Sequence, residues 1–348
     1  MSGTAPQSKP PYLAPVAMPG LVPTKSVDIP IASVLLVFFL GLLVSNILIL
    51  RQNKRAKTPF AFTILLIVYS VLRTAGMSLR IAYASVTNDV NLTIAAMVLA
   101  NAGGIVIFIL NLLIMPRLVR SFWGAERTDA VAWRKKLSTL PFMIPIPLVP
   151  IFLLVVVNVV ILSFFTNDPD VRRHCQTAQK VALVTFTVVA FVPVLPSLAI
   201  AIFGSSKAPR DLSGQHRRGI VGTILDPAPG FGSVRGNALL ILFGSATVTL
   251  GSSIRASGLL LPPRMANDPA WYHKRAAYYI FTFAVEILVV LAYVVFRLDR
   301  RFQEPVAVQA KDKQPDSPTT YVPSREGSTL MGDKEERGSK PGDVAEAV

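Results

Sequence analysis

The sequence predicts an all-α, polytopic membrane protein, a seven-transmembrane-helix bundle with disordered termini. Of its 348 residues, 52% are hydrophobic and only 16% are charged, and the mean hydropathy is +0.51. These values are too apolar for soluble domains of ordinary composition. Seven apolar stretches follow one another, each with about the 20 residues that cross a bilayer. Basic residues concentrate in every second connection between them, which is the pattern of cytoplasmic loops.

The apolar stretches and the segments outside them define the domain organisation. Lipid cannot satisfy free backbone groups, and the stretches do not alternate between apolar and polar residues, so helices are favoured over barrel strands. We expect a membrane domain at 29–302, after a disordered extracytoplasmic tail at 1–28 and before a disordered cytosolic tail at 303–348. The seven stretches cover residues 29–50, 60–85, 92–118, 141–165, 181–203, 237–261 and 276–296.

The distribution of lysine and arginine predicts the orientation. The connections after the first, third, fifth and seventh stretches hold 18 basic residues, and the opposite side holds 8. This asymmetry places the N-terminus outside the cytosol and the C-terminus inside it, without distinguishing plasma membrane from endomembrane. It also accounts for most of the net charge of +15. We therefore expect membrane lipids as partners, anionic lipids among them, and no nucleic acid; the oligomeric state is left open.

Ionisable and amide side chains inside the stretches are the candidate ligand-binding residues. Charge is costly at mid-bilayer, and such groups usually face the interior of a bundle with a partner. At 1.5 Å per residue, most of them fall at a similar depth. Arg80 is the exception, because it lies close to the outer interface, where its side chain can snorkel. The candidates are Arg73 and Arg80 in the second stretch, Asn101 in the third, Asn158 in the fourth, Arg255 in the sixth and Glu286 in the seventh.

Two interpretations of these residues are open. They form either a ligand or transport site or a structural ion-pair network that sets helix register, and we favour the network. In either case we expect Glu286 to pair with Arg255, Arg73 or both. Arg255 is the expected main partner because the sixth and seventh stretches are adjacent. Gly244, Gly251 and Gly258 recur every seven residues on the sixth stretch, which predicts a face where helices pack closely.

No motif predicts a cofactor, a metal site or an enzyme. The chain has one cysteine and three scattered histidines, too few for a thiolate or histidine-rich metal site. Phosphate-binding glycine loops and the usual hydrolase motifs are absent from the sequence. The carboxylates, histidines and single thiol form no recognisable catalytic set. We expect no enzyme activity, and Glu286 would be the only plausible general base.

Three segments together resemble a known family. They are Arg73-Thr-Ala-Gly-Met-Ser-Leu-Arg80, Asn111-Leu-Leu-Ile-Met-Pro-Arg117 and Pro269-Ala-Trp-Tyr-His273, the last followed by Glu286 and Arg297-Leu-Asp-Arg-Arg-Phe302. The chain is similar over roughly 60–302 to a fungal family of seven-span integral membrane proteins that is known only as a domain of unknown function. The resemblance implies a fungal membrane protein of this topology and assigns no activity.

Two classes of function are consistent with these features. Two arginines against one glutamate leave excess positive charge inside the bundle, which predicts a binding or transport protein for an acidic amphiphile or lipid. The alternative is a seven-span sensor or receptor-like signalling protein, which short loops and a Ser- and Thr-rich tail would suit. We favour the first class, because it uses the unusual residues.

Overall fold

The structure is a computed structural model whose regular elements are helices. It describes residues 19–55, 60, 62–86, 89–123, 150–151, 154–158, 168–204, 233–262, 264–265 and 268–302, and no strand occurs among them. The long helices are α1 (Lys25–Arg55), α2 (Phe62–Ser85), α3 (Val90–Trp123), α7 (Pro169–Phe191), α8 (Val194–Phe203) and α10 (Val234–Leu260). The last part of the membrane domain contains η2 (Trp271–His273), α11 (Arg275–Tyr279), the π-helical η3 (Ile280–Ala284), α12 (Val285–Val295) and α13 (Leu298–Arg301).

Six of these helical segments are long and apolar enough to cross a membrane: 25–55, 62–85, 91–123, 173–203, 234–260 and 275–295. They match six of the seven predicted stretches and indicate an integral membrane protein. The fourth predicted stretch, 141–165, lies mostly outside the described residues, with helical backbone at 150–151 and 154–158. The apolar surface agrees with a lipid environment, because large side chains such as Val37 and Phe203 are 68% and 77% exposed.

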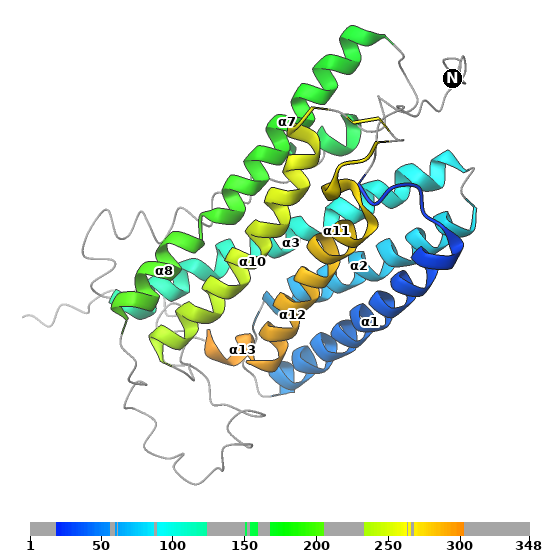
Figure 1. Ribbon diagram of the computed structural model, residues 1–348. Helices are drawn as coiled ribbons and strands as arrows, with labels where there is room; N and C mark the ends of the chain where they lie inside the picture. Colours follow the sequence, from blue (N-terminus) through cyan, green and yellow to red (C-terminus); the bar gives the residue numbers. More distant parts are fainter. Residues whose placement is uncertain are drawn as a thin grey trace, which may run out of the picture. The chain divides into compact units, whose positions relative to one another are not determined.

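Helix α10 occupies a central position in the bundle. It contacts α3, α7, α8 and α12, while α1 packs along α2 and α2 along α3 (Figure 1). Helix α12 also contacts α1, so the last span closes the bundle against the first. The core between these helices contains Phe39, Tyr69, Ile107, Phe283 and Val290, all with no exposed surface.

Two local features deviate from the predicted boundaries. Helix α1 begins at Lys25, so the boundary expected at residue 28 lies inside a helix and residues 19–24 form an ordered segment before it. The fifth predicted stretch is one span in two helices, because α7 ends at Phe191 and α8 begins after Pro193. Proline has no N–H to continue the helical hydrogen bonds, which explains the break. Residues 1–18 and 303–348 lie outside the described residues.

Candidate functional site

The centre of the bundle holds a buried, bidentate ion pair between α2 and α12. Arg73 donates from Nε to Glu286 Oε2 at 2.7 Å and from Nη2 to Glu286 Oε1 at 2.6 Å. Arg73 has no exposed surface and Glu286 is 1% exposed. The remaining guanidinium nitrogen, Nη1, donates to the carbonyl oxygen of Ala100 in α3 at 2.6 Å. A guanidinium that is paired with a carboxylate and donates from all three nitrogens can be accommodated in an apolar interior. The pair and its bond to Ala100 join three helices.

Arg255 of α10 completes the group, which we call the charged layer (Arg73, Arg255 and Glu286). Its Nη1 donates to Glu286 Oε1 at 3.4 Å, and its side chain is 15% exposed. That is its single hydrogen bond to the part of the chain that the structure describes. The prediction that Glu286 pairs with Arg255, Arg73 or both is confirmed, since it contacts both, but the expectation that Arg255 is the main partner is wrong. Helix α2 presents Arg73 for two-point contact, whereas Arg255 reaches the carboxylate with one nitrogen.

Two adjacent glycines of α3 provide the space for the charged layer. A Cβ atom at Gly103 would lie 2.5 Å from Nε of Arg73, and one at Gly104 would lie 3.0 Å from Nη2 of Arg255. Any side chain at these two positions would displace a guanidinium group. Gly103 was not among the residues predicted from the sequence, although a Gly-Gly pair inside a span is a signal of close approach.

Aromatic rings and a π-helical turn surround the pair. The Cζ atom of Arg73 lies 5.1 Å from the ring centroid of Phe283 and 5.9 Å from that of Tyr69, and Tyr69 also donates to Glu286 at 3.2 Å. These are cation–π distances, which help to hold a charge away from water. Phe283 belongs to the π-helical segment η3, directly before the turn that carries Glu286. Single π turns are frequent at functional sites.

A second buried cluster lies toward the N-terminal end of the bundle, where α1 begins. We call it the Asp28 cluster: Asp28, Arg80, Arg275 and Tyr279. Asp28 Oδ1 accepts from Arg80 Nη2 at 3.0 Å and from Tyr279 Oη at 2.7 Å, and Asp28 Oδ2 lies 3.1 Å from Arg275 Nε. The prediction that Arg80 snorkels to an interface is wrong, because its side chain is only 8% exposed and carries a buried partner.

Only Arg80 of this cluster was predicted from the sequence; Arg275 and Tyr279 were not, and neither was Asp28. It was assigned to the disordered tail, yet it lies in the first turn of α1 with no exposed surface. A signal was present: Asp28 and Asp89 are the two acidic residues among the first 100, and Arg80 inside a span requires an acidic partner.

The two candidate asparagines are not placed in the charged layer. Asn101 lies in α3 two residues before Gly103, and its side chain lies outside the described part. Asn158 is 8% exposed, and no described hydrogen bond joins it to Arg73 or Glu286. Their predicted participation therefore stays a prediction.

The glycine face of α10 packs against the last span, as predicted. A Cβ at Gly244 would overlap the hydroxyl of Tyr293, and a Cβ at Gly251 would lie 2.5 Å from the carbonyl oxygen of Phe281 in η3. Tyr293 in turn donates to Asn111 Oδ1 of α3 at 2.7 Å. Close approach of α10 thus holds the π-helical turn and α12 in place around the charged layer.

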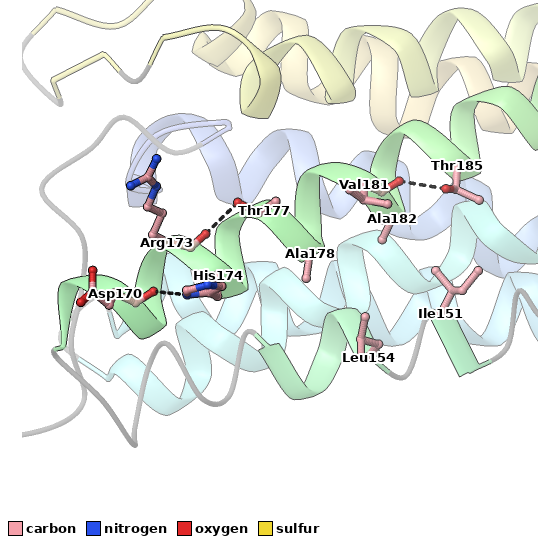
Figure 2. A pocket seen from close by; sticks show the side chains of 10 residues that line it. All are labelled: Ile151, Leu154, Asp170, Arg173, His174, Thr177, Ala178, Val181, Ala182 and Thr185. Carbon is pink, nitrogen blue, oxygen red and sulfur yellow. Dashed lines mark hydrogen bonds between the residues drawn. The ribbon is translucent and has the colours of Figure 1, made fainter.

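A groove of about 730 Å³ lies elsewhere, along α7 (Figure 2). Asp170, Arg173 and His174 line one end of it, and Ile151 and Leu154 line an apolar part. None of the candidate residues lines this groove. It is separate from the charged layer and is the alternative site at which a ligand could bind.

The described residues include no group of three or more His, Cys, Asp or Glu side chains that could hold a metal ion. The ionisable residues of the charged layer carry two positive charges and one negative charge. The layer therefore has the electrostatic capacity for one additional anion next to Arg255, the member that is partly exposed and least firmly paired.

Comparison with known proteins found one similarity, which covers residues 233–303. The model of a family described as a protein of unknown function (DUF3112) matches residues 233–303. This segment runs from α10 to α13 and contains both Arg255 and Glu286. The match supports the predicted resemblance to a domain of unknown function. No curated protein and no solved structure matches the chain.

Proposed function

We propose that this chain is a seven-span integral membrane protein, of the fungal type that the resemblance implies, which binds or transports an acidic amphiphile. The six long apolar helices support the membrane assignment, and the apolar stretch 141–165 supplies the seventh span. The basic asymmetry of 18 to 8 favours an extracytoplasmic N-terminus and a cytosolic C-terminus.

The unequal charge of the layer carries the proposal for the ligand. Arg73 uses all three guanidinium nitrogens on Glu286 and Ala100, so it acts as the fixed support of the carboxylate. Arg255 has one long contact at 3.4 Å and retains donors for a second anion. A carboxylate or phosphate headgroup satisfies such donors, and an attached alkyl chain suits the exposed apolar surface of the helices.

Native mass spectrometry of the purified protein tests this function. The Arg255→Gln variant is expected to lose co-purifying acidic lipid or organic anion that the wild type retains. Arg264→Gln is the matched control, because it removes the same charge from an exposed side chain that pairs with Asp268. Ala178→Trp fills the groove along α7 and reports whether the lipid binds there instead.

The outcome of this experiment separates the two classes of function. Loss of the anion in Arg255→Gln alone supports the binding protein. Equal retention of the same species in Arg255→Gln, with the fold intact, would remove the argument for a bound anion and leave the sensor or receptor-like function ahead.

We also propose that the chain has no enzyme activity. The proposal rests on the sequence, which contains no recognisable catalytic set, and on Glu286 being committed to two arginines. Incubation of the purified protein with mixed lipids, followed by product analysis, tests it. Turnover that disappears in Glu286→Gln without unfolding would contradict the proposal.

The topology has its own test. Tags at the two termini, probed by protease protection in sealed vesicles, should be digested from opposite sides. Digestion of both tags from the same side would contradict the seven-span arrangement.

A further inference from the structure

Residues 19–24, which we call the strap, run across the N-terminal end of the bundle. The N–H of Gly20 donates to the carbonyl oxygen of His273 at 3.0 Å, and the carbonyl oxygen of Gly20 accepts from Arg80 Nη2 at 3.1 Å. Arg275 Nη2 donates to the carbonyl oxygen of Val22 at 3.0 Å. The strap is therefore attached to α2, to η2 and to α11, and it connects directly to α1.

The Asp28 cluster stabilises the strap. Asp28 reaches back to accept the N–H of Thr24 at 2.8 Å, in the manner of a capping box. The same carboxylate holds Arg80 and Arg275, the two arginines that donate to strap carbonyls. One buried carboxylate thus fixes both the start of α1 and the side chains that bind the strap.

Gly20 is shaped for close contact with Tyr278. Its φ of +81° favours glycine, and a Cβ atom there would lie 2.7 Å from Cδ1 of the Tyr278 ring. A larger residue at position 20 would strain the backbone and clash with the ring of Tyr278. Gly20 therefore offers a single position at which the strap can be released.

Tyr278 and Phe283 connect the strap to the charged layer. The rings of Tyr278 and Phe283 meet edge to face with centroids 5.3 Å apart, and Phe283 lies against Arg73. Arg80 is seven residues after Arg73 on α2, so the two clusters are separated by about 10 Å along the bundle. The strap, the Asp28 cluster and the aromatic pair thus succeed one another from the end of the bundle to the layer.

We infer that the strap is a lid over the Asp28 cluster, the aromatic pair Tyr278 and Phe283, and the charged layer. In this role it controls the access of an anionic headgroup to Arg255. The inference rests on the proposed function for the identity of the ligand, an alkyl phosphate or alkyl carboxylate. The closing contacts themselves are independent of the ligand. Opening requires only that the strap leave Tyr278 and the two arginines that bind its carbonyl oxygens.

The experiment measures the reactivity of a buried thiol introduced at position 282, between Tyr278 and Glu286 in the chain. Thr282 is 3% exposed and lies about one helical turn from both Tyr278 and Glu286, and cysteine is similar to threonine in size. Thr282→Cys is placed in a full-length Cys175→Ala background, which removes the single native thiol. The protein is reconstituted in nanodiscs, and its reaction with a charged methanethiosulfonate is followed with time.

Gly20→Val is the releasing variant, and Gly41→Val is its matched control, because a Cβ at Gly41 meets no atom within 4 Å. We expect Gly20→Val to accelerate the reaction by about tenfold. It removes the backbone hydrogen bonds of Gly20, and together these contribute about a factor of ten to the equilibrium between the closed and the released strap. Hydrogen exchange of 19–28 verifies release of the strap, and Arg275→Gln provides a second release should Gly20→Val not fold. Faster association and dissociation of a single-chain alkyl phosphate in the released variant would show that the lid serves Arg255.

Each outcome has a defined meaning. A released strap with an unchanged thiol reaction would overturn the lid, and so would a strap that stays protected in both Gly20→Val and Arg275→Gln. A faster thiol reaction without any alkyl phosphate binding, in wild type or variants, would refute the proposed ligand while leaving the lid in place.

Discussion

Removal of the Arg73 guanidinium should cost the protein more stability than removal of the Arg255 guanidinium. Arg73→Gln deletes two short bonds to Glu286 and one to Ala100 and leaves a carboxylate that is 1% exposed. Breaking a buried pair costs about 3–5 kcal/mol in soluble proteins. Single polar contacts in membrane bundles contribute less, about 0.6–1.7 kcal/mol each. Because Arg255 remains 3.4 Å from the carboxylate, we expect Arg73→Gln to lower the free energy of unfolding by about 3 kcal/mol.

Arg255→Gln should lower the free energy of unfolding by only about 1 kcal/mol, because it removes one long hydrogen bond from a side chain that is 15% exposed. The assay is SDS titration of the micellar protein, followed by far-UV circular dichroism. Arg264→Gln, at an exposed position, is the control and should stay within about 0.5 kcal/mol of wild type. A loss in Arg73→Gln that is no larger than in Arg255→Gln would refute the assignment of Arg73 as the main partner of Glu286.

Two further predictions follow from packing and burial. Gly103→Ala should destabilise the protein by about 1–3 kcal/mol, because its Cβ would press on Arg73. In the same SDS titration the control Gly41→Ala should stabilise the protein by about 0.5–1 kcal/mol. Equal effects of the two substitutions would contradict the claim that Gly103 makes room for Arg73. Burial lowers the pKa of His273 below its ordinary value, so the unfolded state takes up the proton first and stability falls as the pH drops below about 6.5. Between about pH 7.5 and 5.5 the melting temperature should fall less in His273→Phe than in wild type, and parallel pH profiles would contradict a buried neutral imidazole.

The sequence predicted the helical elements well because the bilayer imposes a strong rule. A span needs about 20 apolar residues in a helix, and composition alone reveals such stretches. Six of the seven predicted stretches correspond to long helices with similar bounds. The packing face of α10 was equally visible, because small residues repeated every seven positions indicate close contact whatever the partner is.

The boundary of the first span was harder to predict. Residues 19–28 contain proline and polar residues and have no apolar periodicity, so their composition resembles a solvated tail. Their order depends on Arg80, Arg275 and His273, which follow at least 50 residues later in the chain. Local sequence contains no information about such long-range hydrogen bonds.

The sequence by itself determined that this is a helical membrane protein with buried charges, and that Glu286 requires an arginine. The tertiary structure decided which arginine is the main partner. Arg73 and Arg255 fall at similar depths along their spans, so sequence position could not separate them. Gly103 and Gly104 of α3 make room for the two guanidinium groups, and in the packed bundle Arg73 contacts Glu286 with two nitrogens whereas Arg255 contacts it with one. Depth is a property of a single helix, whereas partner choice depends on the packing of several helices.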